Sequence, residues 1–497
     1  MQQKSESCQN NLMRILLINP PRDNSISSEV PTTVNAETNT IPPLGLLYIE
    51  AHLHKYTQVE TRLIDCLADH LHLEQLRKLI IDYKPQIVGL TGHTHDLIDM
   101  IQVSESVKKD LGKTVKVWWG GPHVSDFPQQ CMKYQCLDGC IPFEGEEAFT
   151  EVVQAHLASW SDSHGYDCQT LENSLRNIAG LFFKDNQGNI VQTCSRPPID
   201  DLDKLPFPRR EILDYRKYSY VLGSEAIATS LLTSRGCPYK CSFCNTPGRT
   251  TWRWRSAKSV VDEMEVCANL GVHEIYIVDD TFNVRRDRVL AICEEINKRS
   301  IKVNWNIRAR ANCLTPETVK AMRLAGCTRV HIGVESGTDA GMKALNKNLT
   351  TDKVRQAFKM LTDEGLTTVC YFMIGCPHDS SIDEINRTVD FAISLDPDYA
   401  LFGILTPYPN TLIYDQGVAR GILDPRHWEN FLANPYPDFK PQVWTEFFTA
   451  SELSSLCDKA FKRFYLRPKQ MFRKLLELKN FNDMARKLKA GWEILKL

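Results

Sequence analysis

The sequence predicts an α/β protein in which a doubly wound, Rossmann-like domain precedes a partial (β/α)6 barrel of the TIM type and a helical C-terminal region. Short apolar runs alternate with amphipathic helical stretches over 13–160, and the same alternation returns over 226–425. Most of these runs are hydrophobic at successive positions, which is typical of parallel strands that helices cover on both faces. Between the two regions the alternation stops.

The first region alternates regularly enough to predict where a ligand binds. Ligands of doubly wound sheets bind at the carboxyl ends of the strands, so we expect the loops that follow the strands to line the site. The predicted strands are 14–19, 61–65, 86–91, 115–121 and a weaker 139–143, and the predicted helices lie near 44–55, 69–83, 96–112 and 146–158.

Residues 161–225 are predicted to form a hairpin and a linker. A turn sequence from Asp185 to Gly188 lies between two strand-like runs, which indicates a β-hairpin. The proline-bearing segment 196–214 then indicates an extended linker.

The second region contains six predicted βα units, which fit a parallel barrel that is either closed or short of eight units. In such folds the loops at the carboxyl ends of the strands carry the chemistry. Residues 426–497 are predicted to form the helical C-terminal region. The predicted barrel strands are 226–233, 274–279, 302–308, 329–334, 367–374 and 399–405.

Whole-chain composition narrows the class of protein. The 497 residues carry a net charge of -2, whereas a general nucleic-acid binder is usually basic, so we expect no nucleic-acid partner. The 17 cysteines are odd in number and most lie singly in apolar runs, which argues against a secreted disulfide framework. The start of the chain lacks the apolar core of a signal peptide, and no stretch reaches about 18 uninterrupted apolar residues. We therefore expect a cytoplasmic protein.

The segment TSRGCPYKCSFCNTPGR (233–249) places Cys237, Cys241 and Cys244 on one loop after the first barrel strand. Three thiolates are one ligand short of a closed tetrahedral zinc site, so zinc would need a distant fourth ligand. A [4Fe–4S] cluster normally takes four cysteines, and three would leave one iron open to a substrate or cofactor.

The spacing Cys-x3-Cys-x2-Cys, with Phe243 before the third cysteine, resembles the radical SAM superfamily. The resemblance implies that the three cysteines hold a [4Fe–4S] cluster whose open iron binds S-adenosylmethionine (SAM), and that electron transfer then releases a 5′-deoxyadenosyl radical. Four later segments agree in order, namely IYIVDDTFNV (275–284), VHIGVESGTD (330–339), YFMIGCPHDS (371–380) and LTPYPNT (405–411).

The same resemblance implies the residues around SAM and the substrate. Two alternatives remain open: the acids at 279 and 280 could cap the following turn, and Glu335 could pair with Arg308 or Arg310. The sequence departs from the family pattern at His378-Asp379 and at Asn410, which leaves the substrate unnamed. The implied SAM contacts are Phe243, Asp279, Arg308, Glu335, Ser336 and Gly375, and the substrate-side candidates are Asp280, His378 and Tyr408.

Loops of the first region are similar to the cobalamin-binding domain of class B radical SAM enzymes. No Gly-x-Gly-x-x-Gly follows the first strand, which disfavours a dinucleotide. The similar segments are INPP (18–21), IPPLGLLYIEAHL (41–53), LTGHTH (90–95), WWGGPHVS (118–125) and FEGEEAF (143–149). The implied cobalamin contacts are Pro20, Leu44, Gly45, Thr91, His93, Gly120, Gly121, His123, Glu144 and Gly145.

Two features of these loops bear on how cobalamin would bind. Gly120 and Gly121 would let the backbone pack against a bulky ligand, although a tight turn after the fourth strand would also explain them. His93, His95 and His123 are interpreted as loop histidines, and the chain has no Asp-x-His-x-x-Gly. We therefore expect cobalamin without a histidine on cobalt.

The resemblance implies a cobalamin-dependent radical SAM enzyme. We expect a methyltransferase acting on an unactivated carbon, in which a substrate radical takes a methyl group from methylcobalamin. An oxidative cyclase or another non-methylating radical enzyme has the same parts, and a non-catalytic cobalamin- or redox-sensing protein is the alternative from a different class. The expected partners are a small-molecule substrate (a lipid, a tetrapyrrole or a natural-product precursor) and a reductant such as flavodoxin or ferredoxin.

The end of the chain, 467–497, is basic and carries an apolar stripe at helical spacing. Such a helix can lie on an anionic membrane surface, although it more often packs on its own protein. The stripe consists of Phe472, Leu475, Leu476, Met484, Leu488, Trp492 and Leu495.

Overall fold

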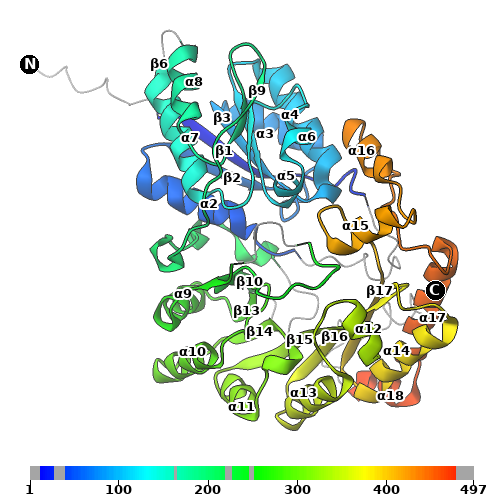
Figure 1. Cartoon of the computed structure of the whole chain (residues 1–497). Coiled ribbons are helices and arrows are strands. Elements are labelled where there is room, and N and C mark those ends of the chain that lie inside the picture. Colours follow the sequence, from blue (N-terminus) through cyan, green and yellow to red (C-terminus); the bar gives the residue numbers. More distant parts are fainter. Residues whose placement is uncertain (1–11, 27–39, 162–164, 219–226, 246–250, 477–497) are drawn as a thin grey trace, which may run out of the picture.

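Two sheets, one in each region, form the framework of the protein (Figure 1). The computed structural model describes residues 12–26, 40–161, 165–218, 227–245 and 251–476. In Figure 1 the first region, blue to cyan, lies above the second, green to yellow, and the orange part of the C-terminal region returns to the side of the first.

The first sheet has the strand order of a doubly wound fold. Its parallel part runs β2-β1-β3-β4-β5, so the order reverses between β1 and β3. Ligands of such sheets bind outside the carboxyl ends of the strands at this switch point. The parallel strands are β1 (Arg14–Asn19), β2 (Glu60–Asp65), β3 (Ile87–Thr91), β4 (Lys116–Gly120) and β5 (Gly139–Ile141).

Helices cover both faces of this sheet because strand side chains alternate in direction. Leu16 and Ile18 pack in one apolar cluster with α3 and α4, whereas Ile15 and Leu17 pack in another with α2 and α7. All four predicted helices are present, and two short ones follow β4. They are α2 (Leu44–Tyr56), α3 (Leu73–Tyr83), α4 (Leu97–Leu111), α5 (Pro122–Asp126), α6 (Pro128–Cys131) and α7 (Glu146–Ser159).

The predicted hairpin is confirmed and extends the first sheet. Strands β8 (Phe182–Lys184) and β9 (Ile190–Gln192) pair antiparallel, and β8 also pairs antiparallel with β5. A helix that was not predicted, α8 (Cys168–Arg176), precedes the hairpin, and the Asp167 side chain caps it by accepting from the backbone N–H groups of residues 169 and 170.

The second sheet is a partial barrel. Its strands are all parallel and lie in chain order, and among the described residues β10 and β17 each pair with one neighbour, so the barrel is open between them. The strands are β10 (Ala228–Leu231), β13 (Glu274–Ile277), β14 (Asn304–Ala309), β15 (Cys327–Glu335), β16 (Thr367–Ile374) and β17 (Tyr399–Ile404). The main covering helices are α9 (Ala257–Asn269), α10 (Arg286–Lys298), α11 (Pro316–Leu324), α13 (Thr351–Asp363) and α14 (Ile382–Leu395).

The C-terminal region packs on both sheets. Helices α15 (Leu412–Ala419) and α16 (Pro425–Ala433) join the apolar core of the first region, where Trp428 stacks near Phe127 and the Tyr134 hydroxyl donates to the Leu432 carbonyl at 2.6 Å. Helix α17 (Ala450–Tyr465) packs on β17. The predicted fold class is therefore confirmed.

The start of the predicted basic helix packs on the protein. Helix α18 (Pro468–Leu476) directs Lys469 and Arg473 at Asp396, and the buried Gln470 side chain donates to the Asp398 carbonyl. Phe472 is exposed. No described helix is both long and apolar enough to cross a bilayer. The side chains of Leu475 and Leu476, and the whole of Met484, Leu488, Trp492 and Leu495, lie outside what the structure describes.

Candidate active site

The three-cysteine loop begins where β10 ends and is tied to the barrel on both sides. Strand β11 (Ser234–Arg235) pairs with β12 (Arg253–Trp254) just before Gly236, whose φ of 84° favours glycine at this turn. Within the loop the Ser242 backbone donates to the Leu345 carbonyl at 3.0 Å and accepts from the Ile413 N–H at 3.0 Å. The loop is therefore fixed at the carboxyl end of the barrel.

Asp279 holds the start of this loop. It is fully buried, and its carboxylate accepts from the backbone N–H groups of Thr233 (2.6 Å) and Ser234 (3.0 Å) and from both hydroxyls. These four donors occupy the carboxylate of Asp279, and the implied contact from this residue to SAM stays a prediction. Asp280, the next residue, lines the cavity described below.

The thiols of Cys237 and Cys241 both act electrostatically on the Cys244 thiol, although the three sulfurs do not all lie within 4.8 Å of one another. Burial, together with charge repulsion from the other two thiols, raises the pKa of the Cys244 thiol to about 11. Three thiolates on one short loop repel one another, so they need a cationic centre to be stable together. This donor set fits an iron–sulfur cluster, which would supply that centre and leave one iron open.

Glu335 and its neighbours form a polar wall beside the loop. Glu335 has a left-handed φ of 72°, a strained conformation that clusters at functional sites, and its carboxylate accepts from the Lys347 ammonium at 2.9 Å. Glu335 therefore does form a buried ion pair, as one of the two alternatives predicted, but its partner is Lys347 and not Arg308 or Arg310. Lys347 also lies over the Phe243 ring, with its nitrogen 5.6 Å from the ring centroid.

The other residues that the resemblance assigns to SAM and the substrate lie in different surroundings. The buried Ser336 hydroxyl lies 3.1 Å from His378 Nε2. Gly375 has a φ of 76°, and a Cβ there would come within 2.7 Å of Leu453, so packing against α17 explains this glycine without a ligand. The Arg308 Nε donates to the Tyr276 hydroxyl at 2.7 Å inside the barrel, and Tyr408 packs near Trp428.

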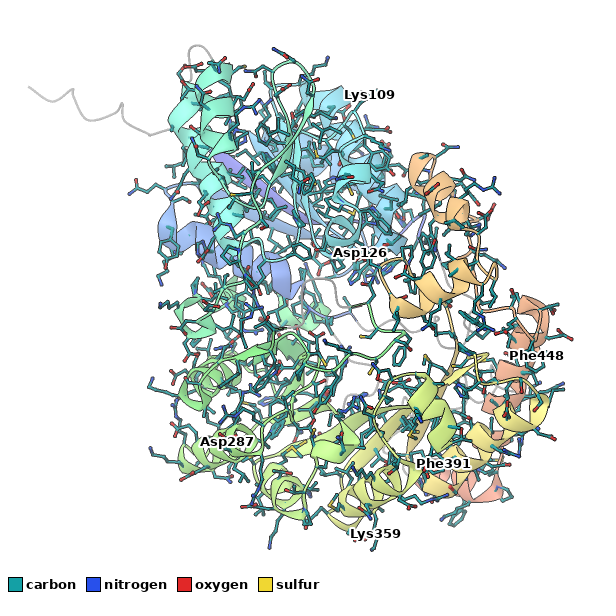
Figure 2. All side chains as sticks on the ribbon, in the orientation of Figure 1. Lys109, Asp126, Asp287, Lys359, Phe391 and Phe448 are labelled. Atoms are coloured by element: carbon teal, nitrogen blue, oxygen red, sulfur yellow. The ribbon has the colours of Figure 1, made fainter. Side chains whose placement is uncertain are left out.

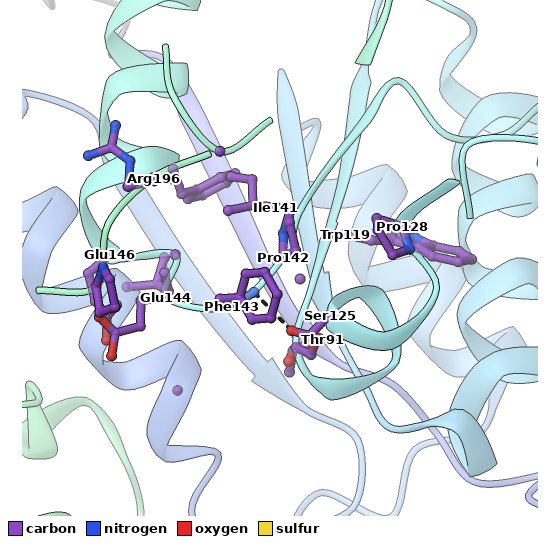
Figure 3. Close-up of a pocket in the computed structure, with 18 of the residues that line it drawn as sticks. Thr91, Trp119, Ser125, Pro128, Ile141, Pro142, Phe143, Glu144, Glu146 and Arg196 are labelled. Atoms are coloured by element: carbon purple, nitrogen blue, oxygen red, sulfur yellow. Dashed lines mark hydrogen bonds between the residues drawn. The ribbon is translucent and has the colours of Figure 1, made fainter. Parts of the chain in front are cut away.

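A cavity of about 890 Å³ opens at the switch point of the first sheet and reaches the second region. Its floor comes from the ends of β1, β3, β4 and β5, and its far wall includes Arg235, Gly236 and Asp280. Figure 3 shows Phe143 among the lining residues, near Thr91 and Ser125. The cavity therefore joins the crevice of the doubly wound domain to the residues directly before Cys237.

The glycines along this cavity serve two different purposes. A Cβ on Gly45 would meet nothing within 4 Å, and one on Gly120 would meet only the Ile141 carbonyl at 3.7 Å, so side chains there would occupy cavity space. In contrast, Gly121 has a φ of 93°, and its Cβ would lie 2.5 Å from the Thr91 hydroxyl, so the tight turn explains it. Gly145 lines the cavity, but a Cβ there would crowd Ile49 at 3.2 Å.

Several implied cobalamin residues lie away from the cavity wall. Pro20, Leu44, His93 and His123 are not among the described residues that line it. His123 is fully buried with Nδ1 3.1 Å from the Thr94 hydroxyl, and burial lowers the pKa of its imidazole to about 3. His93 is exposed and stacks on His95. The contacts of these four residues with cobalamin stay predictions.

Glu144 connects the two regions. Although burial alone would raise its pKa, the bidentate hydrogen bonds from Arg253 (2.8 and 3.0 Å) and the charge of Arg235 lower it below the ordinary value. Arg235 also pairs with Glu146. Asp126, which Figure 2 labels where the regions meet, makes a similar link by accepting from the Asn410 side chain on its carbonyl at 3.2 Å. Glu144 therefore lines the cavity with its carboxylate already occupied.

Sequence reasoning missed several functional candidates. Phe143, at 54% exposure, has a left-handed φ of 65°, which is a strained conformation for an aromatic residue. Its position within FEGEEAF was the available signal. Lys347 had no sequence feature that separates it from other basic residues, and Arg310 was considered only as an ion-pair partner of Glu335. Inside the barrel, Nδ1 of the buried His331 lies 2.8 Å from the Tyr371 hydroxyl. Side chains alternate in direction along a strand, so the positions of these residues in β15 and β16 could have indicated that both face the barrel interior.

Comparison with known proteins identifies the family. Residues 32–153 match the B12 binding domain, and residues 231–392 match the radical SAM superfamily. Over 475 residues the chain is 31% identical to an uncharacterized methyltransferase of Pyrococcus horikoshii, a match covering 95% of this chain and 96% of that protein. The chain belongs to the B12-binding radical SAM family.

Two further relatives show the breadth of this family. The anaerobic magnesium-protoporphyrin IX monomethyl ester cyclase of Rubrivivax gelatinosus is 26% identical over 414 residues, covering 81% of this chain and 70% of that one. The structure of the cobalamin-dependent S-adenosylmethionine radical enzyme OxsB superposes with a TM-score of 0.71 at 17% identity, covering 98% of this chain and 72% of that one. The predicted family and its cofactors, a [4Fe–4S] cluster, SAM and cobalamin, are confirmed.

Proposed function

We propose that this radical SAM enzyme is a methyltransferase acting on an unactivated carbon of a small-molecule substrate. The observation that carries the proposal is the single cavity that runs from the cobalamin crevice to Asp280 and the start of the cluster loop. Similarity to the Pyrococcus methyltransferase along nearly the whole chain supports it. When bound, the cluster with SAM supplies a 5′-deoxyadenosyl radical, and cobalamin supplies a methyl group.

The chain's own residues hold the cofactors and the substrate in position. Cys237, Cys241 and Cys244 would hold the cluster, and Gly45 and Gly120 leave room for cobalamin at the opposite wall. Asp280 lines the cavity between the two, where a substrate would bind. Holding reactants in one enclosed geometry removes much of the entropic cost of the reaction.

Methylation predicts a distinctive product balance. With SAM carrying a trideuterated methyl group, we expect the product to gain the label on carbon, with S-adenosylhomocysteine and 5′-deoxyadenosine formed in equal amounts. Anaerobically reconstituted protein incubated with small-molecule extracts and analysed by mass spectrometry would test this. Cys237→Ala is the control that should abolish 5′-deoxyadenosine formation.

Ring closure is the second candidate, and the similarity to the Rubrivivax cyclase favours it. A cyclase would consume substrate and form 5′-deoxyadenosine without S-adenosylhomocysteine and without label in the product. That outcome would replace the methyltransferase proposal. In this case a tetrapyrrole would be the first substrate class to examine.

We also propose that cobalamin binds without a histidine on cobalt. Among the described residues, those that line the cavity include no histidine, and His123 is enclosed by protein. Paramagnetic resonance of the Co(II) form should therefore lack the triplet splitting that an axial nitrogen causes. A triplet that His93→Ala or His123→Ala removed would contradict the proposal.

A further inference from the structure

Arg310 is an exception among the buried arginines of this protein. Six arginines are at most 8% exposed, and five of them have a carboxylate partner. Arg210 and Arg255 share Glu263, and the other pairs are Arg253 with Glu144, Arg288 with Asp279, and Arg329 with Glu274. For Arg310, at 6% exposure, no carboxylate of the described residues lies within ion-pair distance.

The guanidinium of Arg310 faces the cysteine loop. Its Nη1 lies 3.9 Å from Cys241 Sγ, within the range for an N–H···S hydrogen bond. Its Cζ lies 3.9 Å from the centroid of the Tyr239 ring, so the charged plane rests on the aromatic residue midway between Cys237 and Cys241. Among the described residues, the ionisable group in hydrogen-bond contact with the guanidinium is the Cys241 thiol of this loop.

The position of Arg310 is fixed from several sides. Asn283 clamps its backbone, accepting from the Arg310 N–H at 2.9 Å and donating to its carbonyl at 3.0 Å. Asn312 accepts from its Nε at 3.0 Å. The Tyr239 hydroxyl contacts Cys313 Sγ at 2.9 Å, which holds the ring in place. The charge is therefore pre-oriented before any cofactor binds.

A buried cation without a counter-charge is strongly unfavourable. We propose that Arg310 is the counter-cation of the cluster held by Cys237, Cys241 and Cys244, and that it raises the cluster's reduction potential by charge and by hydrogen bonding to Cys241. Net charge and hydrogen bonds to the sulfurs are two of the factors that set such potentials. Arg310 is thus a positioning and tuning residue for electron entry. The inference rests on the family's cluster and is independent of whether the product is methylated.

A redox titration without SAM tests the inference. In anaerobically reconstituted Arg310→Gln, followed by paramagnetic resonance, we expect the ratio of reduced to oxidised cluster at a fixed potential to fall about tenfold, equivalent to about 59 mV for one electron. Arg323→Gln is the matched control, because Arg323 is an exposed arginine at the far end of α11. Its ratio should equal that of the unmodified protein.

Asn312→Asp covers the case in which Arg310→Gln fails to assemble a cluster. Asn312 is exposed, and an aspartate there would give Arg310 a carboxylate partner without changing side-chain size. We expect the ratio to fall about threefold with the cluster retained. An unchanged ratio in every variant that retains its cluster would overturn the proposal. An unchanged ratio combined with weaker SAM binding in Arg310→Gln would assign Arg310 to SAM instead.

Discussion

The two cofactor sites of this protein are built in opposite ways. Around the cluster loop, charged side chains fix the geometry: Asp279 anchors the backbone, Arg310 faces a cysteine, and Glu335 pairs with Lys347. Along the cobalamin crevice, missing side chains at Gly45 and Gly120 provide room. A compact anion held by ligands needs counter-charge, whereas a bulky ring needs space. Removing side chains should therefore damage the first site, and adding them should damage the second.

The largest expected effect is at the cluster. Replacing Cys237, Cys241 and Cys244 by alanine should remove the cluster's visible absorption and all SAM cleavage, while cobalamin retention stays unchanged. The control is Cys168→Ala with Cys194→Ala, because both thiols are exposed in the segment 161–225 between the two regions and should have no effect. A substantial cluster in the triple variant would show that other cysteines supply ligands.

At the crevice, Gly45→Phe should fill cavity space and lower cobalamin retention at least about tenfold, with the cluster intact. Gly45 lies in the first turn of α2 with open space beside it, so the substitution should not strain the fold. His54→Phe, at an exposed position on the same helix, is the matched control. Absorption spectroscopy after gel filtration measures the bound cobalamin. Full retention by Gly45→Phe would place the corrin elsewhere.

The adjacent acids Asp279 and Asp280 have different positions: the first anchors the backbone of the cluster loop, and the second lines the cavity. Asp279→Asn places an amide against four donors and should lower the free energy of unfolding by about 2–4 kcal/mol, because buried hydrogen bonds to a charged group are lost. Asp280→Asn should lower it less, because Asp280 is only partly buried, whereas Asp279 is fully buried. Thermal denaturation compares the two. Equal destabilisation by both would contradict the distinction.

The smallest expected effect is a pH dependence from His123. Burial lowers the folded pKa of this imidazole to about 3, whereas the unfolded value is about 6.5. The stabilising contribution is therefore complete above pH ~6.5 and falls as the pH drops toward 3, by up to about 1.4 kcal/mol per pH unit. Between pH 7.5 and 5.5, the protein should lose more thermal stability than His123→Gln. Equal losses would indicate that His123 is accessible and free to bind a ligand.

The sequence was sufficient where a pattern repeats. Alternation predicted the strands and main helices of both sheets within a few residues, because burial on two faces imposes it. It could not predict that the 182–192 hairpin joins the first sheet, since β-pairing depends on an edge that only the folded chain presents. Helix α8 was missed because its signal is mainly an Asp167 cap on a short polar stretch.

At the site, motifs identified the right loops but not every role. Asp279 and Asp280 are indistinguishable in sequence, yet one is saturated by backbone donors and the other lines the cavity. For Glu335, the sequence suggested an arginine as the ion-pair partner. The observed partner, Lys347, lies after α12 (Asp339–Ala344), outside every motif identified in the sequence. Such pairings depend on tertiary distances that spacing along the chain does not encode.

The ion pairs of Arg235 limit how this architecture can be recombined. Arg235 is two residues before the first cluster cysteine, and its partners Glu144 and Glu146 belong to the other half of the molecule. A chimera that takes its first half from a relative lacking these acids would leave the buried guanidinium of Arg253 and the largely buried guanidinium of Arg235 without their anions. The halves are therefore not interchangeable modules, and a successful graft must carry the acids and the arginines as a set.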